Sequence, residues 1–422
     1  MISFVHLSDI HFRSFSGDRY DVDNDLRHEL LLDVEHYAKN YLYNVQGVMI
    51  CGDIAFSGKK TEYDVAFNFL GELCNKLKVA KENVYCVPGN HDVDQDVPKK
   101  SVLVKTIQDE LARAETINDF DSVLGKFCRD SKSSELLFSP IECYNTEFAG
   151  KYGCYMTPTN PGWEQDITLN EKYRLRIIGI NSTIISNADD HRSKDERLMC
   201  LGQHQMPSRE DDTICLTLCH HPPICWKDPE QNLQNKLNER VLIQLYGHKH
   251  LQTIEQIGNS LIIGSGATHP SRWEPDWIPR YNWITLDILN GEDTEYLDVK
   301  IYPRILNDAE DQFVADEKLC GDDIYSEFKL MLKPETRIKS NHATLTTNVS
   351  PVVENRTPLV SYKSLTYAFM NLAYVKRSGI ITKLALDREG DDGLKHVEII
   401  GALIKRAEEQ GCVDQLWREI LK

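Results

Sequence analysis

The chain has 422 residues, a net charge of −17 at neutral pH and 41% hydrophobic residues. This length is too great for one ordinary domain and predicts two or three folded units. No window approaches the ~18 consecutive apolar residues that a membrane-spanning helix needs, so no membrane span is expected. The acidic excess repels a phosphate backbone at long range and disfavours a broad groove for duplex nucleic acid. A small anionic substrate that enters a metal-lined pocket fits better, because metal ions reverse the sign of the charge locally.

The cysteine pattern and the N-terminal segment both indicate a cytoplasmic protein. None of the twelve cysteines forms a C-x-x-C pair, which disfavours a zinc ribbon or a thioredoxin-like site. Disulfides are not expected in a reducing compartment. The first residues already form a strand, and this arrangement leaves no room for a signal peptide.

Three short apolar runs in the first hundred residues predict buried strands, at residues 4–7, 47–51 and 84–87. Residues 24–44 and 60–78 lie between these runs and carry apolar positions at helical spacing. This alternation predicts βαβ units in an α/β fold. A turn with polar side chains follows each strand: Asp9 and His11 after the first, Asp53 after the second, Asn90 and His91 after the third.

Residues 93–160 interrupt the alternation of strand and helix. Segments 99–115 and 119–129 predict amphipathic helices, and a stretch rich in aromatic residues follows. Because the segment comes directly after Asn90 and His91, it is placed to form a lid over the strand ends. The alternative is a helical insertion that packs beside the sheet, with the aromatic residues as its core. The sequence favours neither.

Strands resume in the second half of the chain, at residues 174–180, 213–218, 241–246, 260–263, 283–289 and 297–302. His220 follows the second of these strands, and His248 and His250 follow the third. Residues 264–268 are rich in glycine, but no lysine and no helix follow, which predicts a turn and not a phosphate loop. His269, just beyond this turn, is expected to be an ordinary surface residue.

Five strands therefore end in turns that carry Asp, Asn or His. In open α/β sheets, ligands bind at the carboxyl ends of the strands. Carboxylate, amide and imidazole groups without sulfur suit Mn²⁺, Fe, Zn²⁺, Co²⁺ or Ni²⁺ and do not suit a copper site. One such turn is weak evidence, but five in one chain predict a metal centre.

The order of these turns resembles the pattern of the calcineurin-like metallophosphoesterase family. The matching motifs are Asp9-Ile10-His11, Gly52-Asp53, Gly89-Asn90-His91-Asp92, His220 and Gly247-His248-Lys249-His250. Residues 52–58 and 220–223 are most similar to the bacterial branch akin to class III cyclic-nucleotide phosphodiesterases. The resemblance covers residues 1–305. It implies a four-layer α/β/β/α sandwich and two divalent metal ions, for which we expect Mn²⁺.

The resemblance also implies a role for each residue of the motifs. Asp9, His11, Asp53 and His250 would hold one ion, and Asp53, Asn90, His220 and His248 the other. The two ions would activate a water molecule. His91 would protonate or stabilise the leaving oxygen, and Asp92 would orient the His91 imidazole. His221 and His6 are expected to be structural, His6 as a satisfied core histidine.

One position departs from the pattern of the Ser/Thr phosphatase branch of the family. In that branch an Asp stands three residues after the bridging Asp and orients the catalytic histidine. Here Phe56 stands at this position. This departure disfavours a phosphoprotein phosphatase.

The last part of the chain differs in character. Residues 306–357 lose periodicity and predict a linker. Residues 358–422 predict a small all-α bundle, with helical segments at 359–386, 396–410 and 413–421. This region resembles the effector-associated domains, small death-fold-like modules attached to enzymes in bacterial conflict systems. The resemblance implies a protein partner. The alternative is a helical extension that packs on the catalytic domain or dimerises it.

The leading functional hypothesis is a metal-dependent phosphodiesterase that acts on a cyclic nucleotide or another nucleotide. In this hypothesis, a partner recruits the enzyme through its C-terminal helices, as in antiphage defence. One alternative is a Mn²⁺-dependent nuclease, which the acidic charge disfavours. Another is a non-catalytic binding protein on the same fold, which the complete set of metal ligands disfavours.

Overall fold

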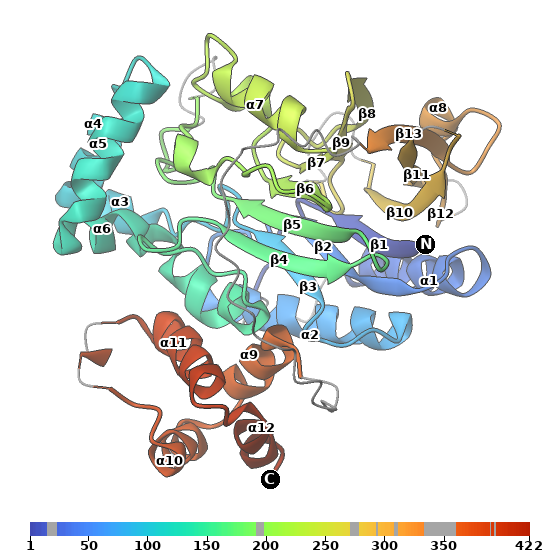
Figure 1. Ribbon diagram of the computed structural model, residues 1–422. Coiled ribbons are helices and arrows are strands. Elements are labelled where there is room, and N and C mark those ends of the chain that lie inside the picture. Colours follow the sequence, from blue (N-terminus) through green and yellow to red (C-terminus); the bar gives the residue numbers. More distant parts are fainter. Residues whose placement is uncertain are drawn as a thin grey trace, which may run out of the picture.

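The computed structural model describes residues 1–14, 23–190, 198–270, 278–292, 294–307, 311–332, 360–388, 390–391 and 394–422. Two β-sheets pack face to face, and helices cover both outer faces (Figure 1). Within these ranges, none of the helices combines the length and the apolar character that crossing a bilayer requires.

The first sheet has seven strands in the order β12-β11-β10-β1-β2-β3, and β13 also pairs with β11. The strands are β1 Ile2–Leu7, β2 Val45–Cys51, β3 Val84–Val87, β10 Arg280–Asn290, β11 Glu295–Asn307, β12 Gln312–Ala315 and β13 Ser326–Leu332. β1, β2 and β3 are parallel. They are joined by α1 (Asn24–Asn40) and α2 (Lys60–Leu77), as the βαβ pattern predicts.

The second sheet has six strands in the order β4-β5-β6-β7-β9-β8. These are β4 Trp163–Thr168, β5 Arg174–Ile180, β6 Thr213–Cys219, β7 Ile243–Tyr246, β8 Gln252–Ile257 and β9 Ser260–Ser265. Helix α7 (Asn232–Arg240) connects β6 to β7. The sequence did not predict β4 and β8. Both are antiparallel edge strands with many exposed polar residues, so they lack the continuous apolar signal of the central strands.

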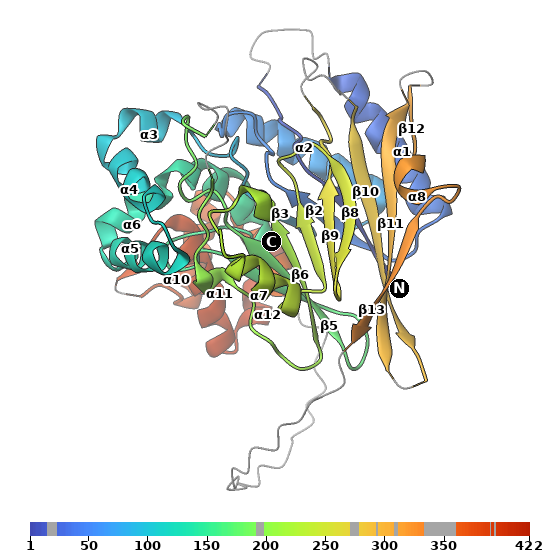
Figure 2. The same cartoon turned by 90° about the horizontal axis from the view of Figure 1, so that it is seen from above.

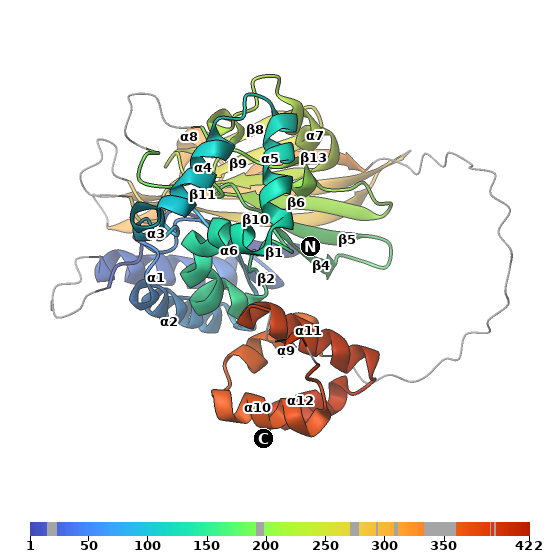
Figure 3. The same ribbon diagram turned by 90° about the vertical axis from the view of Figure 1, so that its left-hand side faces the viewer.

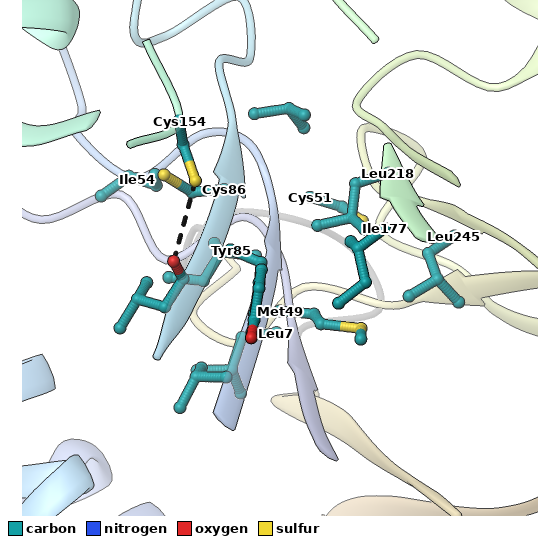
Figure 4. Packing of buried hydrophobic residues seen from close by; sticks show 14 of the residues in the cluster. Leu7, Met49, Cys51, Ile54, Tyr85, Cys86, Cys154, Ile177, Leu218 and Leu245 are labelled. Carbon is teal, nitrogen blue, oxygen red and sulfur yellow. Dashed lines mark hydrogen bonds between the residues drawn. The ribbon is translucent and has the colours of Figure 1, made fainter. Parts of the chain in front are cut away.

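Alternating side chains of β5 fill two different cores. Leu175 and Ile177 pack between the sheets, whereas Ile178 and Ile180 pack under α7. Figure 4 shows the core between the sheets, where Met49 of β2 approaches residues of the second sheet. α1 and α2 cover the outer face of the first sheet and α7 that of the second (Figures 1 and 2). This arrangement confirms the predicted four-layer α/β/β/α sandwich.

The insertion at 93–160 is helical and packs beside the sheets. It contains α3 Asp96–Lys100, α4 Val102–Ala112, α5 Ile117–Arg129 and α6 Ser131–Phe138. The helix predicted at 99–115 is interrupted at Ser101, whose side chain accepts a hydrogen bond from the Val104 amide. Tyr144 and Phe148 are fully buried, and Phe148 stacks on Tyr63 of α2 at 5.5 Å between ring centroids. The aromatic residues therefore form a core, which is the second of the two alternatives that the sequence left open.

The predicted linker at 306–357 begins too early. β12, α8 (Glu317–Cys320) and β13 lie inside this range, and both strands pair with β11. β13 buries Leu330 and Leu332, which pair with the N-terminal half of β11. Long-range pairing, which leaves little local periodicity, explains the error. The rest of the predicted linker, from residue 333, lies outside the described residues.

Four helices form the C-terminal bundle: α9 Tyr362–Met370, α10 Tyr374–Leu384, α11 His396–Glu409 and α12 Val413–Leu421. The segment expected at 359–386 is thus two helices. The bundle has its own apolar core, built from residues such as Phe369, Leu403 and Leu416. α9 and α11 face the β-sandwich, whereas α10 and α12 lie on the far side (Figure 3).

The bundle docks on β3, the strand at one edge of the first sheet. The Nζ of Lys363, on α9, donates to the carbonyl of Val84 (2.8 Å) and to Oε1 of Gln165 (2.7 Å). The same ammonium lies 3.7 Å from the centroid of the Tyr85 ring. Trp163 Nε1 donates to the Cys86 carbonyl at 2.9 Å. Side chains therefore satisfy an edge that would otherwise be open to another strand.

We predict that Lys363→Met lowers the free energy of unfolding by about 1–3 kcal/mol, because it removes the donor to two acceptors at this interface while keeping an apolar stem. Urea unfolding followed by circular dichroism measures the change. Lys405→Met, at an exposed position on α11, is the matched control and should have no effect. Equal unfolding midpoints for the two variants would contradict the docking role of Lys363.

Candidate metal centre

The strand ends of both sheets bring the predicted ligands to one place. β1, β2 and β3 are adjacent and parallel in one sheet, as are β6 and β7 in the other. Their carboxyl ends therefore meet at the same edge of the sandwich. The residues that gather there are Asp9, His11, Asp53, Asn90, His220, His248 and His250.

Asp9, His11 and His250 form one half of the centre. Their candidate ligand atoms lie within 4.8 Å of one another, and His250 Nε2 is 3.2 Å from Asp9 Oδ1. Burial lowers the pKa of His11 to about 3, so its imidazole is neutral and can offer a lone pair. Burial raises the pKa of Asp9, but the hydrogen bond with His250 and the charges of His220 and His250 together keep that pKa below its usual value.

Asn90, His220 and His248 form the other half. Asn90 Oδ1 lies 3.0 Å from His220 Nε2 and 3.0 Å from His248 Nδ1. His220 Nδ1 is 2.7 Å from the Cys51 carbonyl, to which it donates. In a neutral imidazole this bond fixes the tautomer and leaves the Nε2 lone pair facing an amide oxygen. Two lone pairs in contact are stable only when a proton or a metal cation lies between them.

The Asp53 carboxylate lies between the two halves. Its Oδ2 is 3.4 Å from His220 Nε2 and 3.9 Å from His11 Nε2, while its Oδ1 accepts from the His91 amide at 2.8 Å. Burial raises the pKa of Asp53, but His220 and His91 hold it well below its usual range. Burial lowers the pKa of His220, but Asp53 raises it to about 9. The cluster therefore stabilises added positive charge.

Five candidate ligands adopt left-handed backbone conformations. The φ angles are 52° for Asp9, 52° for His11, 51° for Asp53, 67° for His248 and 53° for His250. Such angles are uncommon for residues other than glycine and cost of order ~1–3 kcal/mol each. They turn the chain sharply at the strand ends. Strain concentrated at one cluster indicates a functional site.

Two glycines of the motifs are required by close approach. A Cβ at Gly89 would lie 2.1 Å from Asp53 Oδ1, and a Cβ at Gly247 would lie 1.9 Å from Ser8 Oγ. Any side chain at these positions would displace Asp53 or Ser8. The glycines next to Asn90 and His248 therefore allow the two sheets to bring their ligands together.

The donor set fits two divalent cations that share one carboxylate. Oxygen and nitrogen ligands without sulfur suit Mn²⁺ and its neighbours. The buried Nδ1 of His11 has no hydrogen-bond partner among the described residues, as expected for an atom that completes its shell with a metal. Asp53 Oδ2 lies close to an imidazole of each half, at 3.9 Å from His11 Nε2 and 3.4 Å from His220 Nε2.

His91 lies beside this set and is oriented by a backbone group. Its Nδ1 is 2.8 Å from the Phe56 carbonyl, to which it donates, and its ring lies 5.3 Å from that of Phe56. The imidazole is also 4.6 Å from the His11 ring. The carbonyl of Phe56 thus takes the place of the carboxylate that the phosphatase branch has at this position. His91 Nε2 therefore remains available for proton transfer.

The expectation that Asp92 orients the His91 imidazole is wrong. The fully buried Asp92 carboxylate accepts from the amides of Ile54 (3.1 Å), Ala55 (2.9 Å) and Gly89 (2.9 Å), and from the Tyr63 hydroxyl (3.1 Å). Burial raises its pKa to about 6. Asp92 therefore ties the turn after β2 to the turn after β3, and it positions Asp53 and not His91.

Three further histidines lie in or near the centre. His221 Nδ1 is 2.8 Å from Ser182 Oγ, which agrees with a structural role. His6 is buried as expected, but its Nε2 has no partner among the described residues, so it is not a fully satisfied core histidine. The prediction of a surface position for His269 is wrong. Its side chain is 11% exposed, and Nε2 lies 3.0 Å from Asp23 Oδ1.

Two groups that support the centre were not predicted from the sequence. Ser8 Oγ donates to Asp9 Oδ2 at 2.6 Å and fixes that carboxylate. Its position next to Asp9 is a signal that could have identified it. The Phe56 carbonyl gives no such signal, because every residue has a carbonyl and only the folded turn directs this one to His91.

Comparison with known proteins identifies both parts of the chain. The model of the family described as calcineurin-like phosphoesterase matches residues 2–252, more than half of the chain. The model of the GTPase-associated adaptor domain matches residues 361–422, in agreement with the expected interaction module. The first match covers the sandwich up to the start of β8, and the second coincides with the C-terminal bundle.

One relative is the uncharacterized metallophosphoesterase-like protein YydB of Bacillus subtilis (strain 168), which is 22% identical over 307 residues. The aligned part covers 69% of this chain and 58% of that protein, so the chain spans less than two-thirds of its relative's length. The comparison with solved structures matches Vps29 of Entamoeba histolytica with Zn²⁺, at 12% identity and a TM-score of 0.31, covering 78% of this chain and 98% of that one. Another match is vacuolar protein sorting 29 of Cryptosporidium parvum, at 14% identity and a TM-score of 0.32, covering 78% and 97%.

We predict that the metal-stripped protein takes up two Mn²⁺ ions per chain, and that Asp53→Asn takes up at most one. The substitution removes the charge that both halves share, while it keeps the size of the side chain. Mass spectrometry of the dialysed protein gives the stoichiometry, and His36→Gln, on the surface of α1, is the control. Two ions retained by Asp53→Asn would show that the carboxylate does not bridge.

Asp92→Ala should lower the free energy of unfolding by about 2–4 kcal/mol, because three buried amides and a hydroxyl lose their acceptor. Thermal unfolding of the metal-free protein measures this effect without any contribution from bound ions. Asp92→Asn keeps one acceptor oxygen and should lose less stability. A variant Asp92→Ala with unchanged stability would show that Asp92 does not hold the two turns together.

Proposed function

The chain belongs to the calcineurin-like phosphoesterase family, and from this premise we propose that it is a metal-dependent hydrolase that cleaves a nucleotide phosphodiester. The observation that carries the proposal is the position of Asp53, whose Oδ2 approaches imidazoles of both halves of the centre. Two-metal sites need one such shared ligand to clamp the attacking and leaving oxygens of an in-line displacement.

Asp9, His11, Asp53 and His250 would hold one ion, and Asp53, Asn90, His220 and His248 the other. We propose Mn²⁺, with Fe, Zn²⁺, Co²⁺ and Ni²⁺ as ions of the same ligand preference. When bound, the ions stabilise charge on the phosphoryl oxygens and lower the pKa of water. The side chains of the protein supply the metal ligands and the proton donor.

His91 is the proposed general acid. Donation from Nδ1 to the Phe56 carbonyl fixes the ring, so Nε2 is the atom that can deliver a proton. In hydrolysis, a bond forms between phosphorus and a water oxygen, which gives up a proton to solvent, while the bond to the leaving oxygen breaks. The leaving oxygen then takes the proton from His91 Nε2. The buried carboxylate of Asp92 supports this arrangement from a distance, by fixing Asp53.

The charge of the chain bears on the substrate. Residues 356–422 carry 11 basic and 9 acidic side chains, so the first 355 residues contain the whole acidic excess. Such a surface disfavours long duplex DNA and favours a small nucleotide that reaches the metal ions. The apolar residue at position 56, where phosphoprotein phosphatases have a carboxylate, supports a phosphodiester over a phosphoprotein.

The C-terminal domain is the proposed site of recruitment by a protein partner. α10 and α12 face away from the catalytic layers (Figure 3). At the start of α10, Tyr374 is 74% exposed and Val375 is 81% exposed, and these apolar side chains suit a protein surface. Recruitment of a hydrolase through such a domain, in the cytoplasm of a bacterium, fits an effector of a conflict system.

Hydrolysis of bis(p-nitrophenyl) phosphate and of unactivated nucleotide phosphodiesters, with Mn²⁺ and with EDTA, tests the proposal. We predict that His91→Ala lowers kcat by about 10²–10⁴-fold for the unactivated ester, because its alkoxide needs a proton. The loss should be much smaller for the nitrophenyl ester, whose leaving group needs none. Equal losses for both esters would exclude proton transfer by His91, and full activity in EDTA would exclude the metal mechanism.

A further inference from the structure

Arg13 is a cation two residues after the candidate ligand His11. Its side chain is exposed, and its guanidinium carbon lies 3.5 Å from the centroid of the Phe56 ring. That ring is 5.3 Å from the His91 imidazole and 6.2 Å from that of His11. The Phe56 ring thus lies against both the Arg13 guanidinium and the imidazole of His91, the proposed proton donor to the leaving oxygen.

Backbone pairing fixes the position of Arg13. The Phe12 amide donates to the Ile54 carbonyl at 2.8 Å, and the Phe56 amide donates to the Phe12 carbonyl at 3.0 Å. This short parallel pairing sets Arg13 beside Phe56. Stacking then holds the guanidinium plane without using its N–H groups.

The charge of Arg13 is not neutralised within the described part of the chain. No carboxylate among those residues lies within ion-pair distance of its guanidinium, although the protein as a whole is strongly acidic. All five N–H donors of the side chain are thus available to an anion from solution. This planar fork binds phosphate, as it binds carboxylate, through two parallel hydrogen bonds.

We propose that Arg13 binds a second phosphate, carried by the leaving part of the substrate, and that the substrate is a linear nucleotide phosphodiester. This inference rests on the proposed function. The scissile phosphate would lie at the metal ligands, and Arg13 is not among them. A 3′,5′-cyclic mononucleotide has one phosphate, and its leaving oxygen belongs to the same ribose, so it offers Arg13 no second anionic group. A short single strand offers a further phosphate on either side.

The experiment compares three dinucleotides with Mn²⁺: TpT, which has one phosphate, and pTpT and TpTp, which carry a second phosphate at opposite ends. We expect the wild-type protein to prefer one of the two phosphorylated dinucleotides over TpT in kcat/KM, by about ten- to a hundredfold. Arg13→Gln should remove most of this preference, chiefly through KM, and Arg13→Lys should restore part of it. Lys405→Gln changes the charge equally, far from the centre, and should keep the preference.

The ratio of the kcat/KM values for the dinucleotides distinguishes recognition of the second phosphate from structural damage. A structurally disturbed site loses activity on all three dinucleotides alike. A wild-type protein that hydrolyses TpT, pTpT and TpTp equally well would overturn the role of Arg13 and leave the proposed function intact. So would a higher kcat/KM for a 3′,5′-cyclic nucleotide than for any of the dinucleotides. Absence of Mn²⁺-dependent hydrolysis of every phosphodiester would overturn both.

Discussion

The contact of the Asp53 carboxylate with imidazoles from both sheets is the interaction on which the site depends. Asp53, Asp9, His11 and His220 are buried together at the junction of two sheets. Burying charges without compensation is costly, and the raised pKa of His220 is one sign that this cluster requires positive charge. Two divalent cations would supply it. The fold, the strained turns and the glycines of the motifs all serve to keep these groups close together.

Backbone groups, and not further side chains, orient several of the reactive residues. The carbonyl of Cys51 fixes the His220 tautomer, and that of Phe56 fixes His91. Asp92 acts one step further away, because it holds the amides of the turns that carry Asp53 and Asn90. Asp92 follows the proposed acid His91 in the sequence, but it positions Asp53, the proposed bridging ligand of the metal ions. Phe56 has two functions, since its carbonyl orients His91 while its ring supports Arg13.

The C-terminal domain packs directly against the first sheet. Its α9 reaches the edge of the first sheet through Lys363, and burial lowers the pKa of that lysine to about 8. The contact lies on β3, the strand that ends in Pro88 and the turn with Asn90 and His91. The domain thus protects the edge strand nearest to the proposed acid, while α10 and α12 stay on the opposite side for other contacts (Figure 3).

The sequence by itself determined the α/β class, the central strands, the ligand motifs and the helical C-terminal module. These features follow from local patterns, because buried parallel strands and amphipathic helices have characteristic periods and the ligand residues follow strand ends directly. Only the tertiary structure decided the role of Asp92, the burial of the aromatic insertion and the pairing of β13 within the expected linker. It also decided the positions of His269 and Lys363. Each of these depends on contacts between residues far apart in the chain, and such contacts leave no period in the sequence from which they could be predicted.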